Sequence, residues 1–240
     1  MIKAFRLFGI IVYLHWSLLI FVAMIAIQEA NRLSWWQGIV AGSILAIVLF
    51  SSVLFHEFAH SLVGRRYGVG FSQITLFVFG GAAKMDNEVR KPWSEFIMAA
   101  AGPAASFVLY LVCRAVAVAG VLIGGQDINP HIGVILSVIR QVGELNLLLA
   151  GFNMIPAFPM DGGRLLRATL WHFKGFKKAT RWASYTGSIF GWTLIGCGAL
   201  MCFGITVPVF GTGMVSGVWI AFMGWLINSM ANRERASLGQ

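Results

Sequence analysis

Charged side chains are scarce in this chain of 240 residues, where they make up 11% of the sequence against 58% hydrophobic residues. Soluble domains ordinarily have about a quarter of their residues charged. The low charge therefore excludes an ordinary soluble domain, and the remaining polar sequence is too short for a sizeable extramembrane domain. We expect the whole chain, residues 1–240, to form a single domain in a lipid bilayer.

Cysteines and acidic residues are also few. Cys113, Cys197 and Cys202 lie in apolar stretches without a close-spaced pair, which excludes a cysteine-rich metal site and indicates that they pack. Nine acidic residues stand against 18 basic ones, for a net charge of +9. Because the Lys and Arg residues cluster in short segments between apolar runs, they indicate membrane topology and no nucleic-acid partner.

Long apolar runs predict an all-α polytopic membrane protein with about six transmembrane helices. The predicted helices cover residues 7–28, 38–63, 94–119, 138–160, 182–204 and 210–231. Six crossings place both termini on one side of the membrane, and most of the basic residues fall on that side. By the positive-inside rule both termini are expected in the cytoplasm. So compact a chain fits a prokaryotic plasma membrane.

The segment of residues 69–85, between the second and third predicted helices, is apolar but too short to cross a bilayer. Its residues 74–79 are rich in β-branched and aromatic side chains, and Gly80 and Gly81 follow. The segment therefore predicts a short re-entrant β segment that dips into the membrane where protein shields its backbone. An amphipathic surface loop is the alternative interpretation.

The second predicted helix ends in an H-E-x-x-H pattern, His56-Glu57-Phe58-Ala59-His60. Positions i and i+4 share one helix face, so both imidazoles can reach one zinc ion while Glu57 acts on metal-bound water. Burying these three polar side chains in hydrocarbon is costly unless they are paired or bind something. A polar patch that lines a cavity is the alternative interpretation.

Zinc in a hydrolytic site usually takes three protein ligands, so the two histidines need a third. The candidate is Asp161, which follows the fourth predicted helix and two helix-breaking prolines, Pro156 and Pro159. Helices two and four run in the same direction across the membrane, so the histidines and Asp161 are expected at similar depths. Without that topology, an Asp-Gly-Gly sequence would be typical of a turn.

Together the motifs resemble the site-2 protease family of intramembrane zinc metalloproteases, peptidase family M50. The resemblance is carried by His56-Glu57-x-x-His60 and by Asn153-x-x-Pro156-x-x-Pro159-x-Asp161-Gly162, with support from His15-Trp16-Ser17, Phe79-Gly80-Gly81 and Ala101-Gly102-Pro103. It covers the first four predicted helices. Residues of about 1–165 would then form the catalytic core, and residues 182–231 two further transmembrane helices.

The resemblance implies that His56, His60 and Asp161 bind one zinc ion and that Glu57 is the catalytic acid and base. It also implies that the active site lies towards the cytoplasmic side of the membrane. The expected partners are the lipid bilayer and membrane proteins whose transmembrane helices are cut within or near the bilayer. The sequence sets no oligomeric state.

Three further residues or segments have open roles. The Asn153 amide could donate to the oxyanion of the tetrahedral intermediate, or it could be a hydrogen-bonded residue at the helix break. His15 is interpreted as a neutral histidine hydrogen-bonded to a neighbouring helix. A substrate helix must unwind before cleavage, and a free strand edge at residues 74–79 could accept it as an added β-strand.

Two rival functions remain at this stage. A six-helix bundle with a broken fourth helix and polar residues in the membrane could be a transporter or channel. A transporter gives no reason, however, for a glutamate between metal-spaced histidines. A catalytically inactive relative that binds transmembrane partners is the other alternative, although His56, Glu57, His60 and Asp161 are all present.

Overall fold

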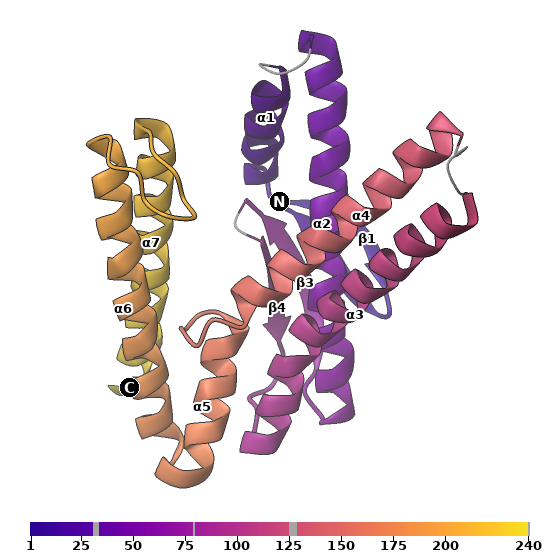
Figure 1. Cartoon of the computed structure of the whole chain (residues 1–240). Helices are drawn as coiled ribbons and strands as arrows, with labels where there is room; N and C mark the ends of the chain where they lie inside the picture. Colours follow the sequence, from indigo (N-terminus) through magenta and orange to yellow (C-terminus); the bar gives the residue numbers. More distant parts are fainter. Residues whose placement is uncertain (31–33, 79, 125–128, 240) are drawn as a thin grey trace. The chain divides into compact units, whose positions relative to one another are not determined.

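The computed structural model describes residues 1–30, 34–78, 80–124 and 129–239. Its elements in chain order (Figure 1) are β1 (Ile2–Leu7), β2 (Ile10–Leu14), α1 (Ser17–Ala30), α2 (Trp35–Arg66), β3 (Phe71–Phe77), β4 (Gly80–Met85), α3 (Pro92–Gly124), α4 (Pro130–Asn153), α5 (Asp161–Lys174), α6 (Phe176–Cys202), α7 (Met214–Ala236) and η2 (Ser237–Gly239). The chain divides into two compact units. Unit 1 comprises residues 1–89 and 101–151, and unit 2 comprises residues 90–100 and the chain from Phe152 on.

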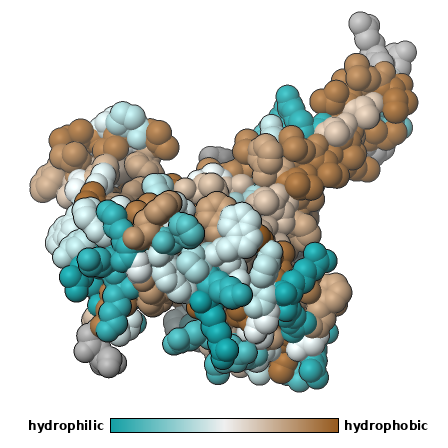
Figure 2. Space-filling view, turned by 90° about the horizontal axis from the view of Figure 1, so that it is seen from below, coloured by the Kyte–Doolittle hydropathy of each residue, from teal (hydrophilic) through white to brown (hydrophobic). Residues whose placement is uncertain are grey.

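Among the described residues, five helices are long and apolar enough to cross a membrane. The five spans are Trp35–Arg66, Pro92–Gly124, Ile135–Asn153, Phe176–Cys202 and Met214–Ala236. Figure 2 shows hydrophobic side chains exposed over a large part of the surface in that view, as is expected of helices that face lipid. The predicted helices at 38–63, 94–119, 182–204 and 210–231 all coincide with helices of the structure to within a few residues.

The predicted helix at residues 7–28 is wrong over its first ten residues. Residues 10–14 form strand β2, and helix α1 begins only at Ser17, so its apolar part is shorter than a full membrane span. Ile10 and Val12 alternate on one face of β2 and are fully buried. Pairing with β3 and the enrichment in β-branched residues favour a strand here, whereas the run of hydrophobic residues alone does not distinguish the two structures.

Unit 1 contains a four-stranded sheet in the order β1-β2-β3-β4. The β3 and β4 strands form an antiparallel hairpin within residues 69–85, which confirms a β segment there, while β2 and β3 pair in parallel. Phe79 lies outside the described residues. Because β3 has a partner on each side, the expectation of a free edge at residues 74–79 is wrong, and the two edge strands of the sheet are β1 and β4. Insertion of the hairpin into the bilayer stays a prediction.

The predicted helix at residues 138–160 is also wrong at its end, because α4 stops at Asn153 and α5 begins at Asp161. Pro156 and Pro159 lie in the loop between them and lack the backbone N–H that a continuing helix requires. The Phe158 backbone N–H donates to the Ala183 carbonyl of α6 at 3.3 Å. This hydrogen bond holds the loop of residues 154–160 against α6, and Asp161 is the first residue of a new helix.

Helices α6 and α7 of unit 2 pack closely through glycines. A Cβ placed on Gly191 would lie 2.7 Å from the Gly224 carbonyl oxygen, and one placed on Gly217 would lie 2.6 Å from the Gly198 carbonyl oxygen. No larger side chain fits at either position without separating the helices. The glycines of this helix pair thus serve packing within the chain.

A buried cluster of charges holds α5 in place within unit 2. Glu95, in the first turn of α3, is fully buried, and Arg167 of α5 is 8% exposed. Arg167 donates through Nε to the Glu95 carboxylate at 2.9 Å and through Nη1 to Glu234 of α7 at 2.6 Å. Its guanidinium also lies 5.3 Å from the ring centroid of Phe158. The cluster ties α5 to the first turn of α3 and to α7.

We expect Glu95→Ala to lower the free energy of unfolding by about 3 kcal/mol, because breaking a buried pair leaves one charge uncompensated. The measurement is denaturant-induced unfolding in detergent, followed by tryptophan fluorescence. The exposed Glu88 gives the matched control, since Glu88→Ala removes an acid without leaving a buried charge. Equal stability of the two variants would show that the cluster does not hold unit 2 together.

Candidate metal centre

The two histidines of the H-E-x-x-H pattern lie one turn apart in the C-terminal half of α2. His56 is 2% exposed and His60 is 5% exposed. Their Nε2 atoms are 3.1 Å apart, and their rings meet edge to face with the centroids separated by 4.8 Å. Both imidazoles therefore present the same nitrogen to one point, as the i, i+4 spacing predicts.

Ser106 of α3 lies behind His56, and its Oγ atom is 3.1 Å from His56 Nδ1. When Nδ1–H donates to this hydroxyl oxygen, the Nε2 lone pair is left for a ligand. Second-shell hydrogen bonds of this kind fix the tautomer and the orientation of metal-binding histidines. Sequence reasoning missed Ser106, although its position four residues after Gly102 on one helix face could have identified it.

Gly102 of α3 faces the two Nε2 atoms. A Cβ at this position would lie 2.6 Å from His56 Nε2 and would overlap His60 Nε2. Space next to the two nitrogens is therefore kept free of side-chain atoms by the glycine. Two imidazoles with converging nitrogens beside such a space are a donor set suited to a divalent ion such as zinc.

Glu57 follows His56 on α2, and the edge strand β4 lies against it. A Cβ placed on Gly81 would lie 2.5 Å from Glu57 Cγ and 3.1 Å from Glu57 Oε1. The absence of a side chain at Gly81 lets β4 approach the carboxylate closely. The Glu57 carboxylate thus lies beside the histidine pair and next to the one strand of the hairpin that has an open edge.

The other two predicted site residues belong to unit 2, and the histidines belong to unit 1. Asp161 is 8% exposed and begins α5, and Asn153 is the half-buried last residue of α4. A Cβ on Gly162 would overlap the Met154 and Ile155 carbonyl oxygens. The glycine therefore lets the loop of residues 154–160 fold against the first turn of α5, next to Asp161.

His15 lies at the junction of β2 and α1, so its predicted position in the middle of a helix is wrong. Its Nδ1 atom is 2.8 Å from Ser17 Oγ, and Ser17 Oγ accepts the Val78 backbone N–H at 3.1 Å. The expectation of a hydrogen bond to a neighbouring helix is therefore wrong, because His15 bonds within its own turn and, through Ser17, is connected to the β3–β4 hairpin. This role is structural.

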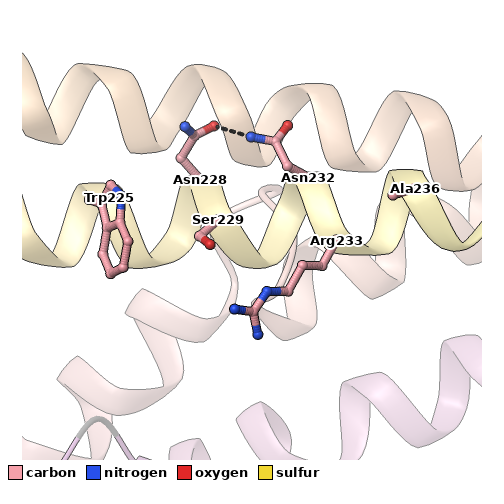
Figure 3. A pocket seen from close by; sticks show the side chains of 6 residues that line it. All are labelled: Trp225, Asn228, Ser229, Asn232, Arg233 and Ala236. Atoms are coloured by element: carbon pink, nitrogen blue, oxygen red, sulfur yellow. Dashed lines mark hydrogen bonds between the residues drawn. The ribbon is translucent and has the colours of Figure 1, made fainter.

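A surface hollow of about 360 Å³ lies along α7 (Figure 3). In it the Asn232 side-chain amide donates to Asn228 Oδ1 at 3.2 Å. The lining residues are Trp225, Asn228, Ser229, Asn232, Arg233 and Ala236. This lining has no carboxylate, imidazole or thiol, so the hollow does not offer the donor set of the histidine pair.

The family model of peptidase family M50 matches residues 44–127 and 119–194 of the chain. This chain belongs to peptidase family M50. The match contains both histidines, Glu57 and Asp161, and it extends beyond the four helices that carry the sequence motifs into α6. The five apolar helices of this M50 member identify it as an integral membrane protein.

Individual relatives agree with the family. The chain is 35% identical over 94% of its length to a candidate zinc metalloprotease of Synechocystis, sll0528. It is 37% identical over 78% of its length to zinc metalloprotease MJ0392 of Methanocaldococcus jannaschii. The chain spans 57% and 50% of the lengths of these two relatives. The solved structure of a site-2 protease from Methanocaldococcus jannaschii superposes with a TM-score of 0.66, at 30% identity, over 98% of this chain and 94% of that one.

We expect Gly102→Ala to reduce the zinc content of the purified protein several-fold, because the new methyl group takes the space beside the histidine nitrogens. Gly151→Ala in α4 is the matched control, since a Cβ there meets nothing within 4 Å. Zinc is measured by elemental analysis after equilibration with a fixed free zinc concentration. Parent-like zinc content in Gly102→Ala would show that the space is not part of a metal centre.

Proposed function

We propose that this M50 member is a zinc-dependent intramembrane endopeptidase that cuts peptide bonds within or near transmembrane helices. The observation that carries the proposal is the buried histidine pair on α2, with converging Nε2 atoms and Glu57 beside it. Helix α2 is long and apolar enough to span a bilayer. Polar residues in such a helix mark a functional site, because they are costly to keep there otherwise.

Asp161 is the proposed third zinc ligand. Asp161 is the first residue of α5, directly after the loop of residues 154–160, and a carboxylate is one of the ligand types that zinc takes in proteins. His56, His60 and Asp161 each offer one ligand atom, which is the three-residue set of a catalytic zinc site. The relatives named as zinc metalloproteases support zinc as the metal.

When bound, zinc would polarise the scissile carbonyl and would lower the pKa of a bound water to about 7. The Glu57 carboxylate accepts the proton of that water and later delivers it to the leaving amine nitrogen. Asn153 is proposed to donate a side-chain N–H to the oxyanion. Ser106 keeps His56 in the tautomer whose Nε2 faces the metal.

The substrate is proposed to bind as an extended strand on β4. A peptide bond in a helix is hydrogen-bonded and sterically closed, so the substrate must unwind locally. Strand β4 is at the edge of the sheet, and its Gly81 lies against Glu57. Pairing with β4 would replace the lost helical hydrogen bonds next to the catalytic carboxylate.

Both termini are proposed to be cytoplasmic, in a prokaryotic plasma membrane, with the active site towards the cytoplasm. Strand β2 pairs with β3, which follows α2, so the N-terminal sheet lies on the side where α2 ends. Arg65 and Arg66 are at that end of α2, and Arg233 and Arg235 are in the last turn of α7. These basic residues support a cytoplasmic assignment.

We expect Glu57→Gln to reduce cleavage at least 100-fold without loss of zinc, because an amide cannot accept the proton of the water. The assay uses protein reconstituted in vesicles and a panel of labelled single-pass transmembrane segments, with products read by mass spectrometry. Glu88→Gln changes an exposed acid in the same way and serves as the control. Undiminished cleavage by Glu57→Gln would refute the role of Glu57, and a parent that cuts no segment while holding zinc would favour a binding protein.

A further inference from the structure

Helices α3 and α4 of unit 1 bring three charged side chains together away from the histidine pair. A Cβ on Gly143 of α4 would lie 2.9 Å from Cys113 Cβ of α3, so the two helices are in close contact there. This contact places Arg114, the next residue of α3, beside Arg140 and Glu144 of α4. The three side chains line a hollow of about 190 Å³ with Tyr110, Gly143 and Leu147, which we name the Arg114 pocket.

The Arg114 pocket lies within the apolar part of the α3–α4 hairpin. Ten residues of α3 follow Arg114, and the apolar span of α4 begins at Ile135, five residues before Arg140. At 1.5 Å per residue these stretches are about 15 Å and about 8 Å long, against a hydrocarbon core of about 30 Å. Leu122 and Ile123 near the end of α3 are 76% and 88% exposed, as lipid-facing side chains are. The hairpin lies at the right in Figure 1, and the same arm in Figure 2 is covered mainly by hydrophobic side chains.

The charges of the pocket do not balance. Arg140 Nε lies 3.5 Å from Glu144 Oε1, and these side chains are 56% and 57% exposed. Within the described ranges no ion pair is recorded for Arg114, which is itself exposed. The pocket therefore carries a net charge of one positive unit between two helices that are apolar enough to cross a membrane. A charge so placed is costly unless an opposite charge from another molecule reaches it.

We propose that the Arg114 pocket binds the carboxylate of an acidic residue in the transmembrane helix of a partner protein. One carboxylate neutralises the surplus charge, and the planar guanidinium groups suit carboxylate recognition. A lipid phosphate lies outside the hydrocarbon core, whereas Arg114 lies ten residues inside the end of α3. A second copy of this chain would bring its own surplus positive charge. A helix with one aspartate or glutamate near its middle fits both the depth and the charge.

The test is the binding of a designed helix to the full chain in phosphatidylcholine vesicles, measured by fluorescence energy transfer. The probe is a Leu-Ala helix of about 23 residues with a single central Glu, compared with the same helix carrying Gln. Both are bound to the Glu57→Gln variant, so the result does not depend on the proposed cleavage. We expect roughly tenfold tighter binding of the Glu helix.

Two variants of the Arg114 pocket should change the preference for the Glu helix over the Gln helix in opposite directions. Arg114→Gln should abolish it, and Glu144→Gln should increase it, because the competing carboxylate of the pocket is removed. Arg181→Gln, at an exposed position in α6, is the control and should leave it unchanged. If Arg114→Gln fails to fold, Glu144→Gln alone decides the question.

Three results would overturn the proposal. The first is equal affinity of the Glu and Gln helices for a chain with an intact pocket. The second is displacement of the Glu helix by phosphatidylglycerol added to the vesicles, which would identify a phosphate site. The third is self-association that Arg114→Gln or Glu144→Gln weakens in the absence of the helix, which would identify a second copy as the occupant.

Discussion

Keeping two imidazoles and a carboxylate inside a helix that crosses a bilayer is the constraint on which the rest of the structure depends. Neutral or charged, these groups need partners that hydrocarbon does not supply. The structure supplies them from the neighbouring elements of unit 1. Ser106 contacts His56 from α3, and β4 reaches Glu57 because Gly81 has no side chain. The sheet at the end of α2 is thus part of the environment of Glu57, the proposed catalytic acid and base.

Glycines allow the backbone to approach closely next to the polar side chains of both units. Gly102 keeps the space beside the histidine nitrogens free, and Gly162 lets the loop of residues 154–160 fold against the start of α5. The helix that begins with Asp161 is then held by the Glu95–Arg167–Glu234 cluster, in which each charge has an opposite partner. Small residues and paired charges therefore do the same task in both units: they fix a polar side chain without exposing it to lipid.

The sequence predicts the histidine pair and the main helices well because local rules govern both. The i, i+4 spacing of His56 and His60 determines their geometry on any helix, and long apolar runs identify spans such as α2. The errors arise where partners distant in sequence decide. Residues 10–14 become a strand because β3 pairs with them, and the same pairing removes the free edge expected at residues 74–79. The place of Ser106 on one helix face with Gly102 could indicate a site residue, but its partner His56 follows only from the contact of α3 with α2.

Zinc content per chain of the detergent-purified protein tests the central claim most directly, because it requires no substrate. The measurement compares the parent with His56→Ala and Asp161→Ala, and with Asp86→Ala as an exposed control. The account predicts about one zinc per chain in the parent and the control, with a marked loss in both ligand variants. A folded parent that holds no zinc after zinc is supplied, or ligand variants that hold as much as the parent, would contradict it.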